Sequence, residues 1–217
     1  EYRRQRQMCI RDRKNRVAVV TGGAQGFGLA ITERFITSGA SVVIWDIDKN
    51  ECKKAISKIN SKNCTFQIVD VRQIKEVEKK LNEIEKKFGK IDILVTAAGM
   101  QHRESIESFD KEKWNKILEV NLSGTFHCAQ AVVKHMTKRK KGRIIMISSL
   151  TAEIGIPHIA AYAASRGGIK QLGKTMSVEL ATSGITVNCV GPGRFRTKMT
   201  EDIFSDEVKR KKFLEVI

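Results

Sequence analysis

The stretch RVAVVTGGAQGFG, residues 16–28, decides the fold of this 217-residue chain. It begins with an apolar, strand-like run, and glycines follow at Gly22, Gly26 and Gly28 before a helix predicted to begin near Leu29. Glycines in such a turn let the backbone approach a pyrophosphate closely, and the free N–H groups of a helix N-terminus favour an anion. The stretch therefore predicts a phosphate-binding turn between a strand and a helix.

Similar apolar runs recur along the chain, and segments with helical spacing of apolar residues separate them. Including the first, the runs cover residues 16–21, 41–46, 64–70, 92–98, 143–148 and 185–190. Strands that are apolar almost throughout and alternate with helices indicate a parallel sheet covered on both faces. We therefore expect an α/β fold with a Rossmann-type doubly wound parallel sheet in three αβα layers, as a single domain over residues 16–217. Its ligands should lie at the carboxyl ends of the strands.

Asp46 ends the second run, 18 residues beyond Gly28. A carboxylate at this position can accept hydrogen bonds from adenosine ribose hydroxyls, and it repels a 2′-phosphate. No Lys or Arg stands in the glycine-rich turn or directly after Asp46, so the pattern favours NAD over NADP. The alternative is that Asp46 only caps the following turn, beside Asp48.

The composition excludes several classes of function. The net charge is +16, but lysines and glutamates alternate along helical segments such as KEVEKKLNEIEKKFGK, which is typical of a solvated helix face rather than of a nucleic-acid partner. The 5 cysteines and 4 histidines show neither disulfide nor metal-ligand spacing, so we expect no metal and a reducing, cytoplasmic location. No apolar run approaches the length of a membrane span.

Residues 1–15 are expected to lie outside the domain, and the domain is expected to be incomplete at its C-terminal end. Residues 1–15 have neither an apolar core nor a helical stripe, and QRQMCIRDR resembles the peptide encoded by sequencing-adapter DNA. The alternative is a natural basic arm that is disordered until it binds. At the other end, no C-cap signal or closing strand follows the last helical segment, so we expect the domain to be truncated there.

Several motifs, in order, resemble those of the classical short-chain dehydrogenase/reductase family from about Arg16 to the last residue. TGGAQGFG (21–28) matches the cofactor turn T-G-x-x-x-G-x-G, and Asp70 with Val71 matches the pair that contacts adenine. TAAG (96–99) resembles the element N-N-A-G, with Thr96 in place of an asparagine, and NCVGPGRFRT matches the stretch that embraces the nicotinamide. The resemblance implies that the cofactor is bound by Gly22, Gln25, Gly26, Phe27, Gly28, Asp46, Asp70, Val71, Ala98, Gly99, Tyr162, Arg166, Pro192, Gly193 and Thr197.

The catalytic positions of that family fall on Asn121, Ser149, Tyr162 and Arg166. The resemblance implies that the backbone carbonyl of Asn121 holds a water of the proton relay, that Ser149 hydrogen-bonds the substrate oxygen, and that Tyr162 is the general acid/base. Each residue alone has a simpler alternative. Asn121 caps or bends its helix, Ser149 is a turn hydroxyl, or Tyr162 is an ordinary interface aromatic.

Arg166 stands where the family has a lysine. Tyr162 and Arg166 are four residues apart, so on a helix they project from one face. A tyrosine, with an ordinary pKa of about 10, needs a nearby cation to act as a base near neutrality. Arginine supplies the charge but does not pass protons on, and its larger head must fit a pocket sized for an ammonium, so we expect impaired turnover. The alternatives are a sequence error or a relay through ribose and water.

The resemblance implies reversible hydride transfer between a nicotinamide and a secondary alcohol or ketone, on a sugar, polyol or hydroxy acid. One alternative is an NADPH-dependent 3-oxoacyl-[acyl-carrier-protein] reductase, against which Asp46 argues. Another is an NAD-binding protein without turnover, which Arg166 suggests. We expect residues 101–103, 154–158 and 194–204 to shape the substrate site. Arg103, Arg194 and Arg196 indicate either a polar or anionic substrate or, as the alternative, ordinary solvated arginines. The resemblance also implies a homotetramer or homodimer for the full-length protein.

Overall fold

The computed structural model describes residues 13–197, 200–208 and 210–211. Within these residues a parallel sheet has the strand order β3-β2-β1-β4-β5-β6. The strands are β1 (Val17–Thr21), β2 (Ser41–Asp46), β3 (Cys64–Ile68), β4 (Ile93–Thr96), β5 (Gly142–Ile147) and β6 (Ile185–Val190). Every predicted apolar run overlaps one of them, and the predicted doubly wound α/β fold is confirmed.

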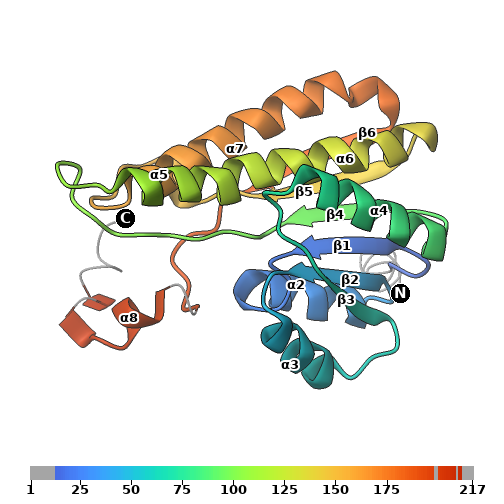
Figure 1. Cartoon of the computed structure of the whole chain (residues 1–217), viewed down its shortest axis with the longest axis horizontal. Helices are drawn as coiled ribbons and strands as arrows, with labels where there is room; N and C mark the ends of the chain where they lie inside the picture. Colours follow the sequence, from blue (N-terminus) through green and yellow to red (C-terminus); the bar gives the residue numbers. More distant parts are fainter. Residues whose placement is uncertain (1–12, 198–199, 209, 212–217) are drawn as a thin grey trace, which may run out of the picture.

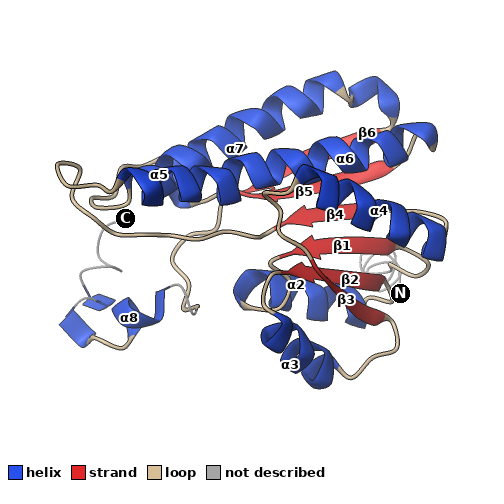
Figure 2. Cartoon of the chain, viewed as in Figure 1, coloured by secondary structure: helices blue, strands red, loops and turns tan. Residues whose placement is uncertain are grey.

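Helices cover both faces of the sheet and give the predicted three layers (Figures 1 and 2). One face carries α2 (Gly26–Thr37) and α3 (Lys49–Ile59), and the other carries α4 (Ile74–Phe88), α6 (Gly124–Lys138) and α7 (Ala160–Glu179). α5 (Lys111–Leu118) leads into α6 through a π-helical turn (Glu119–Ser123). Short 3₁₀ turns lie at Leu150–Ala152 and Ala181–Ser183, and α8 (Glu201–Phe204) follows β6.

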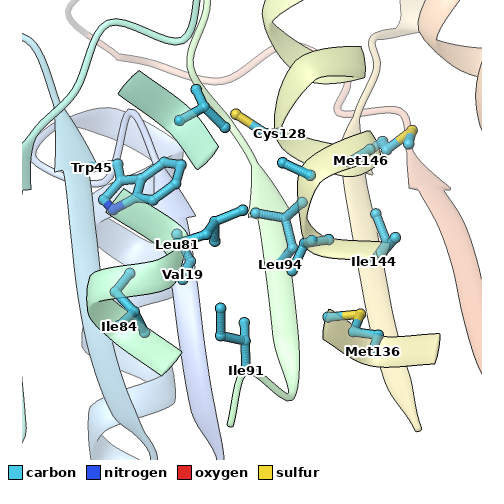
Figure 3. Packing of buried hydrophobic residues seen from close by; sticks show 14 of the residues in the cluster. Val19, Trp45, Leu81, Ile84, Ile91, Leu94, Cys128, Met136, Ile144 and Met146 are labelled. Atoms are coloured by element: carbon cyan, nitrogen blue, oxygen red, sulfur yellow. The ribbon is translucent and has the colours of Figure 1, made fainter. Parts of the chain in front are cut away.

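The larger part of the core lies between the sheet and α4, α6 and α7. Figure 3 shows Trp45 of β2 and Leu94 of β4 packed against Leu81 of α4, with Cys128 and Met136 of α6 beside them. All of these side chains are fully buried. This packing fixes the helices on the sheet, so the loops at the carboxyl ends of the strands start from rigid positions.

Two of the predicted boundaries that differ from the structure have local hydrogen-bonding reasons. α2 begins at Gly26 rather than near Leu29, because Leu29 N–H already donates to the Gln25 carbonyl at 3.0 Å. The predicted strand over 92–98 ends at Thr96 because the next two N–H groups, of Ala97 and Ala98, donate to the Thr21 hydroxyl at 3.1 and 3.0 Å. That hydroxyl ties the ends of β1 and β4 together.

The chain order reverses at β1, which has β2 on one side and β4 on the other. Thr21 pairs in register with Trp45 of β2 and with Thr96 of β4, so the carboxyl ends of these strands are level. A crevice at such a switch point is where doubly wound sheets bind ligands.

At the amino ends of the strands, Asp92 joins the start of β4 to the start of β1, and its side chain is 3% exposed. Its carboxylate accepts hydrogen bonds from Val17 N–H at 2.9 Å and from the Arg139 guanidinium at 2.8 Å, and Arg16 lies at 3.4 Å. Burial by itself raises the pKa of Asp92, but the hydrogen bonds from Val17 and Arg139 outweigh it, so the pKa lies below its ordinary value. The ionised carboxylate therefore stabilises the fold.

We expect Asp92→Asn to lower the free energy of unfolding by about 3 kcal/mol at pH 7, because it leaves the Arg139 cation without its buried partner. A depressed pKa contributes stability above the unfolded value of about 3.9, and this stability is lost as the pH falls through the folded value. Urea unfolding of both proteins should therefore show a difference that shrinks below about pH 4. The control is Glu78→Gln, which breaks an exposed pair with Lys134 and should cost less than about 1 kcal/mol. Equal losses in the two variants would contradict the prediction.

The predicted arm over residues 1–15 lies mostly outside the described residues. Arg13, near its end, donates its N–H to the Ser38 carbonyl at 2.7 Å, and its guanidinium lies 4.6 Å from the centre of the Phe35 ring. No helix in the described part of the chain is long and apolar enough to cross a membrane. No group of three His, Cys, Asp or Glu side chains there is arranged to hold a metal ion.

Candidate active site

The glycine-rich turn after β1 is too tight for side chains at three of its positions, Gly22, Gly23 and Gly28. Gly22 has a φ of +61°, and a Cβ there would lie 2.8 Å from the Cα of Ala98. A Cβ on Gly28 would lie 2.1 Å from the carbonyl oxygen of Gly22. The N-terminus of α2, which follows, has no side-chain cap and no acidic residue in its first turn. The turn therefore offers backbone N–H groups and a positive helix end to an anion.

The carboxylates of Asp46 and Asp48 lie at the end of β2 and at the start of α3, respectively. Asp46 accepts hydrogen bonds from Ala24 N–H at 3.3 Å and from Asp48 N–H at 3.2 Å, so the predicted alternative of a turn-capping role is also realised. Burial, together with the charges of Asp46 and Asp48, raises the pKa of the Cys52 thiol to about 12.

Asp70 follows β3 and is engaged by its neighbour Arg72. The Arg72 guanidinium donates to both carboxylate oxygens of Asp70, from Nη2 to Oδ2 at 2.6 Å and from Nε to Oδ1 at 3.0 Å, and this pairing lowers the pKa of Asp70. The carbonyl of Val71, between them, lies 3.0 Å from Nδ1 of His127 on α6. Arg72 was not predicted from the sequence, although its place two residues after an aspartate at a strand end is a signal for such a turn.

A cavity of about 740 Å³ lies at the carboxyl ends of the strands. Every residue predicted to bind the cofactor lines it, from the glycine-rich turn and Asp46 to Thr197 in the loop after β6. Ser149 lines it as well, whereas Asn121 is fully buried behind it. Thus segments from both halves of the sheet meet around one cavity.

Ser149 and Tyr162 reach this cavity from adjoining elements. Ser149 precedes the 3₁₀ turn after β5, and its hydroxyl accepts a hydrogen bond from Thr151 N–H at 3.2 Å. Tyr162 lies in the first turn of α7, which begins at Ala160. A serine and a tyrosine hydroxyl on one cavity wall can together hold an alcohol or carbonyl oxygen.

Asn121 lies within the π-helical turn between α5 and α6. Its side chain accepts from Met100 N–H at 2.8 Å and donates to the Met100 carbonyl and to the Ser165 hydroxyl, both at 3.0 Å. Its backbone carbonyl accepts the Thr125 hydroxyl at 2.7 Å. Asn121 therefore joins the end of β4 to α7, and the π-helical turn lies where such turns often mark functional sites.

Arg166 is buried, with 3% of its surface exposed. Its Nη1 donates to the Ile147 carbonyl at 2.7 Å, and its guanidinium carbon lies 4.8 Å from the centre of the Tyr162 ring. Its Nη2 lies 2.4 Å from where a Cβ on Gly99 would stand. The cation thus lies against the tyrosine ring face and is directed into the end of β5.

These features fit a dinucleotide. The glycines leave room for a backbone approach to pyrophosphate, the uncapped N-terminus of α2 suits its charge, and Asp46 provides acceptors for ribose hydroxyls. Ser149 and Tyr162 stand at the same cavity. Fold and site together define a dinucleotide-binding oxidoreductase of the α/β class.

Comparison with known proteins gives the family. The sequence profile of the short chain dehydrogenase family matches residues 16–208. The chain is 37% identical to 5-keto-D-gluconate 5-reductase of Escherichia coli over 191 residues, which are 87% of this chain and 75% of that protein. It is 36% identical to the Escherichia coli 3-oxoacyl-[acyl-carrier-protein] reductase FabG, covering 89% of this chain and 79% of that protein.

A solved structure is similar throughout. The gluconate 5-dehydrogenase from Burkholderia cenocepacia J2315, in complex with NADP and tartrate, superimposes with a TM-score of 0.88 at 32% identity, covering 94% of this chain and 80% of that chain. The chain belongs to the short-chain dehydrogenase family. It is an oxidoreductase that transfers a hydride between a nicotinamide cofactor and a CH–OH group or ketone.

Proposed function

We propose that the chain is an NAD-preferring dehydrogenase of a small hydroxy acid, such as a sugar acid. The observation that carries the proposal is that one cavity is lined by carboxylates and also by arginines. Asp46 and Asp48 line one part of it, and Arg103 and Arg194 line it together with Ser149 and Tyr162. Arginines in a substrate pocket favour a carboxylate.

The preference for NAD is supported by the carboxylates of Asp46 and Asp48, which line the cavity. These carboxylates oppose a 2′-phosphate, because like charges brought together cost several kcal/mol. The residue that follows Asp46 is Ile47, which offers no positive charge. The Burkholderia cenocepacia relative was solved with NADP, so the cofactor needs a direct test.

In the proposed mechanism the protein supplies positions and proton transfer. The nicotinamide, when bound, supplies or accepts the hydride. Tyr162 takes the hydroxyl proton of the alcohol or returns it to the ketone oxygen, and Ser149 donates a hydrogen bond to that oxygen. Asn121 holds the end of β4 against α7 through Met100 and Ser165. We also propose that the full-length protein acts as a homo-oligomer in the cytoplasm.

A second candidate function follows from the relatives. The FabG proteins, at 35–36% identity in enterobacteria, are named as 3-oxoacyl-[acyl-carrier-protein] reductases. This activity would need a long acyl thioester to enter near Ser149. The apolar residues Leu150, Ile156 and Ile159, which also line the cavity, are compatible with that substrate.

We expect purified protein to form NADH from NAD with D-gluconate or another aldonate faster than with neutral polyols or 3-hydroxyacyl thioesters.

Asp46→Ser should shift the ratio of kcat/KM for NAD and NADP about tenfold or more toward NADP, since it removes the repelling charge. Arg103→Gln should raise KM for the acid and leave KM for a neutral alcohol unchanged. Equal use of both cofactors by the wild type would contradict the NAD preference. Turnover of thioesters alone would favour the second candidate.

A further inference from the structure

Two phenylalanines that line the cavity contact each other. Phe27 lies in the first turn of α2, between Gly26 and Gly28, and Phe195 lies in the loop after β6. Their ring centres are 5.1 Å apart, and their planes are inclined by 82°. Both side chains line the cavity. This edge-to-face geometry is the favourable one for aromatic pairs.

The pair joins distant parts of the sheet. Phe27 follows β1, in the middle of the sheet, whereas Phe195 follows β6, and both β4 and β5 lie between these strands. The same two segments also approach each other at Gly26 and Thr197, since a Cβ on Gly26 would lie 4.0 Å from the Cβ of Thr197. The loop after β6 therefore reaches back over the phosphate-binding turn.

Hydrogen bonds hold the backbone around Phe195 to its own segment. The Thr200 hydroxyl donates to the Phe195 carbonyl at 2.7 Å and accepts from Thr197 N–H at 2.9 Å. Arg196 pairs with Glu201 at the start of α8. These contacts join Phe195–Thr197 to Thr200 and Glu201, and Figure 1 shows α8 set apart from the sheet and its covering helices. None of them fixes Phe195 to the glycine-rich turn, so the contact between the two rings can open while they are kept.

The exposure of Phe195 argues against a purely structural role. Its surface is 53% exposed, and it belongs to none of the buried clusters of the core. An aromatic side chain so exposed adds little to folding stability, yet it contacts the turn that is proposed to hold the pyrophosphate. Its contact with Phe27 is therefore placed to act on a ligand in the cavity.

We propose that Phe27 and Phe195 form an aromatic clasp that retains the nicotinamide dinucleotide and sets its release rate. The inference rests on the proposed dinucleotide site. A ligand that fills the cavity from Asp46 to Tyr162 leaves when the loop after β6 moves away from the glycine-rich turn. Release then requires the two rings to separate, which costs the free energy of their contact.

The test measures NADH release by stopped-flow fluorescence, with NADH-loaded protein mixed into excess NAD. Phe195→Leu and Phe27→Leu should each increase the dissociation rate constant about two- to tenfold, because each keeps apolar bulk and removes the ring pair. The double variant should be no faster than the faster single variant, since both changes remove one contact. The unfolding midpoint of Phe195→Leu should stay near that of the wild type.

Phe109→Leu is the matched control, because Phe109 forms an edge-to-face pair with Trp114 and does not line the cavity. Its NADH release should equal that of the wild type. Unchanged release in both clasp variants, or additive effects in the double variant, would overturn the clasp while leaving the dinucleotide site intact. Wild-type protein that binds no NADH would instead overturn the proposed site on which the clasp rests.

Discussion

Tyr162→Phe is expected to lower kcat by about 10²- to 10⁴-fold, the range that a positioned general acid/base contributes. Phenylalanine removes the hydroxyl that moves the proton. It keeps the ring, on which the Arg166 guanidinium rests at 4.8 Å from the ring centre. The packing at the start of α7 and the binding of cofactor should therefore survive.

The measurement is steady-state NADH formation at saturating substrate, with the dissociation constant for NADH taken from fluorescence titration. We expect the dissociation constant to change by less than about threefold, because the cation–ring contact is kept. Ser149→Ala serves as a comparison, and it should cost less than Tyr162→Phe because it removes only a hydrogen bond to the oxygen. If Tyr162→Phe kept most of the wild-type kcat, the proton would have another route and the assignment of Tyr162 would be wrong.

The fold could be predicted because its signals are local and repeated. A buried parallel strand needs an apolar run of residues. In the glycine-rich turn, a Cβ at Gly22 or Gly28 would clash with neighbouring backbone atoms, so these positions require glycine. The strand ends were less predictable. β4 ends at Thr96 because the N–H group of the next residue, Ala97, donates to the hydroxyl of Thr21 at the end of β1. Ala97 and Thr21 are 76 residues apart in sequence, and no local pattern encodes their contact.

Individual site residues could be predicted only where they belong to a sequence motif. Asp46 and Tyr162 line the cavity as expected. Arg72 was not assigned a role from the sequence, and Phe195 was predicted only as part of the substrate-site segment 194–204. Their roles depend on contacts made in three dimensions, with Asp70 and Phe27, respectively. The direction of the Arg166 side chain could not be predicted either, because an i, i+4 spacing fixes a shared helix face and not the partner that a long side chain selects.

Arg166→Lys is expected to raise kcat by about ten- to hundredfold, because small misplacements at a reacting centre carry costs of that size. The guanidinium is held by the Ile147 carbonyl and lies under the Tyr162 ring, so its donors are directed into the sheet. A lysine has a shorter polar head and can give up its proton, whereas arginine stays protonated at any accessible pH.

The same change should lower the free energy of unfolding by about 1 kcal/mol, since it removes the hydrogen bond to the Ile147 carbonyl. A gain in kcat together with a loss in stability would show that Arg166 serves packing better than proton transfer. Arg166→Met is the matched control, because it keeps an unbranched chain without the charge, and its kcat should fall below that of the wild type. If Arg166→Lys left kcat unchanged and Arg166→Met lowered it, the arginine would be a competent electrostatic partner of Tyr162, with the proton leaving through ribose and water, and the expectation of impaired turnover would be wrong.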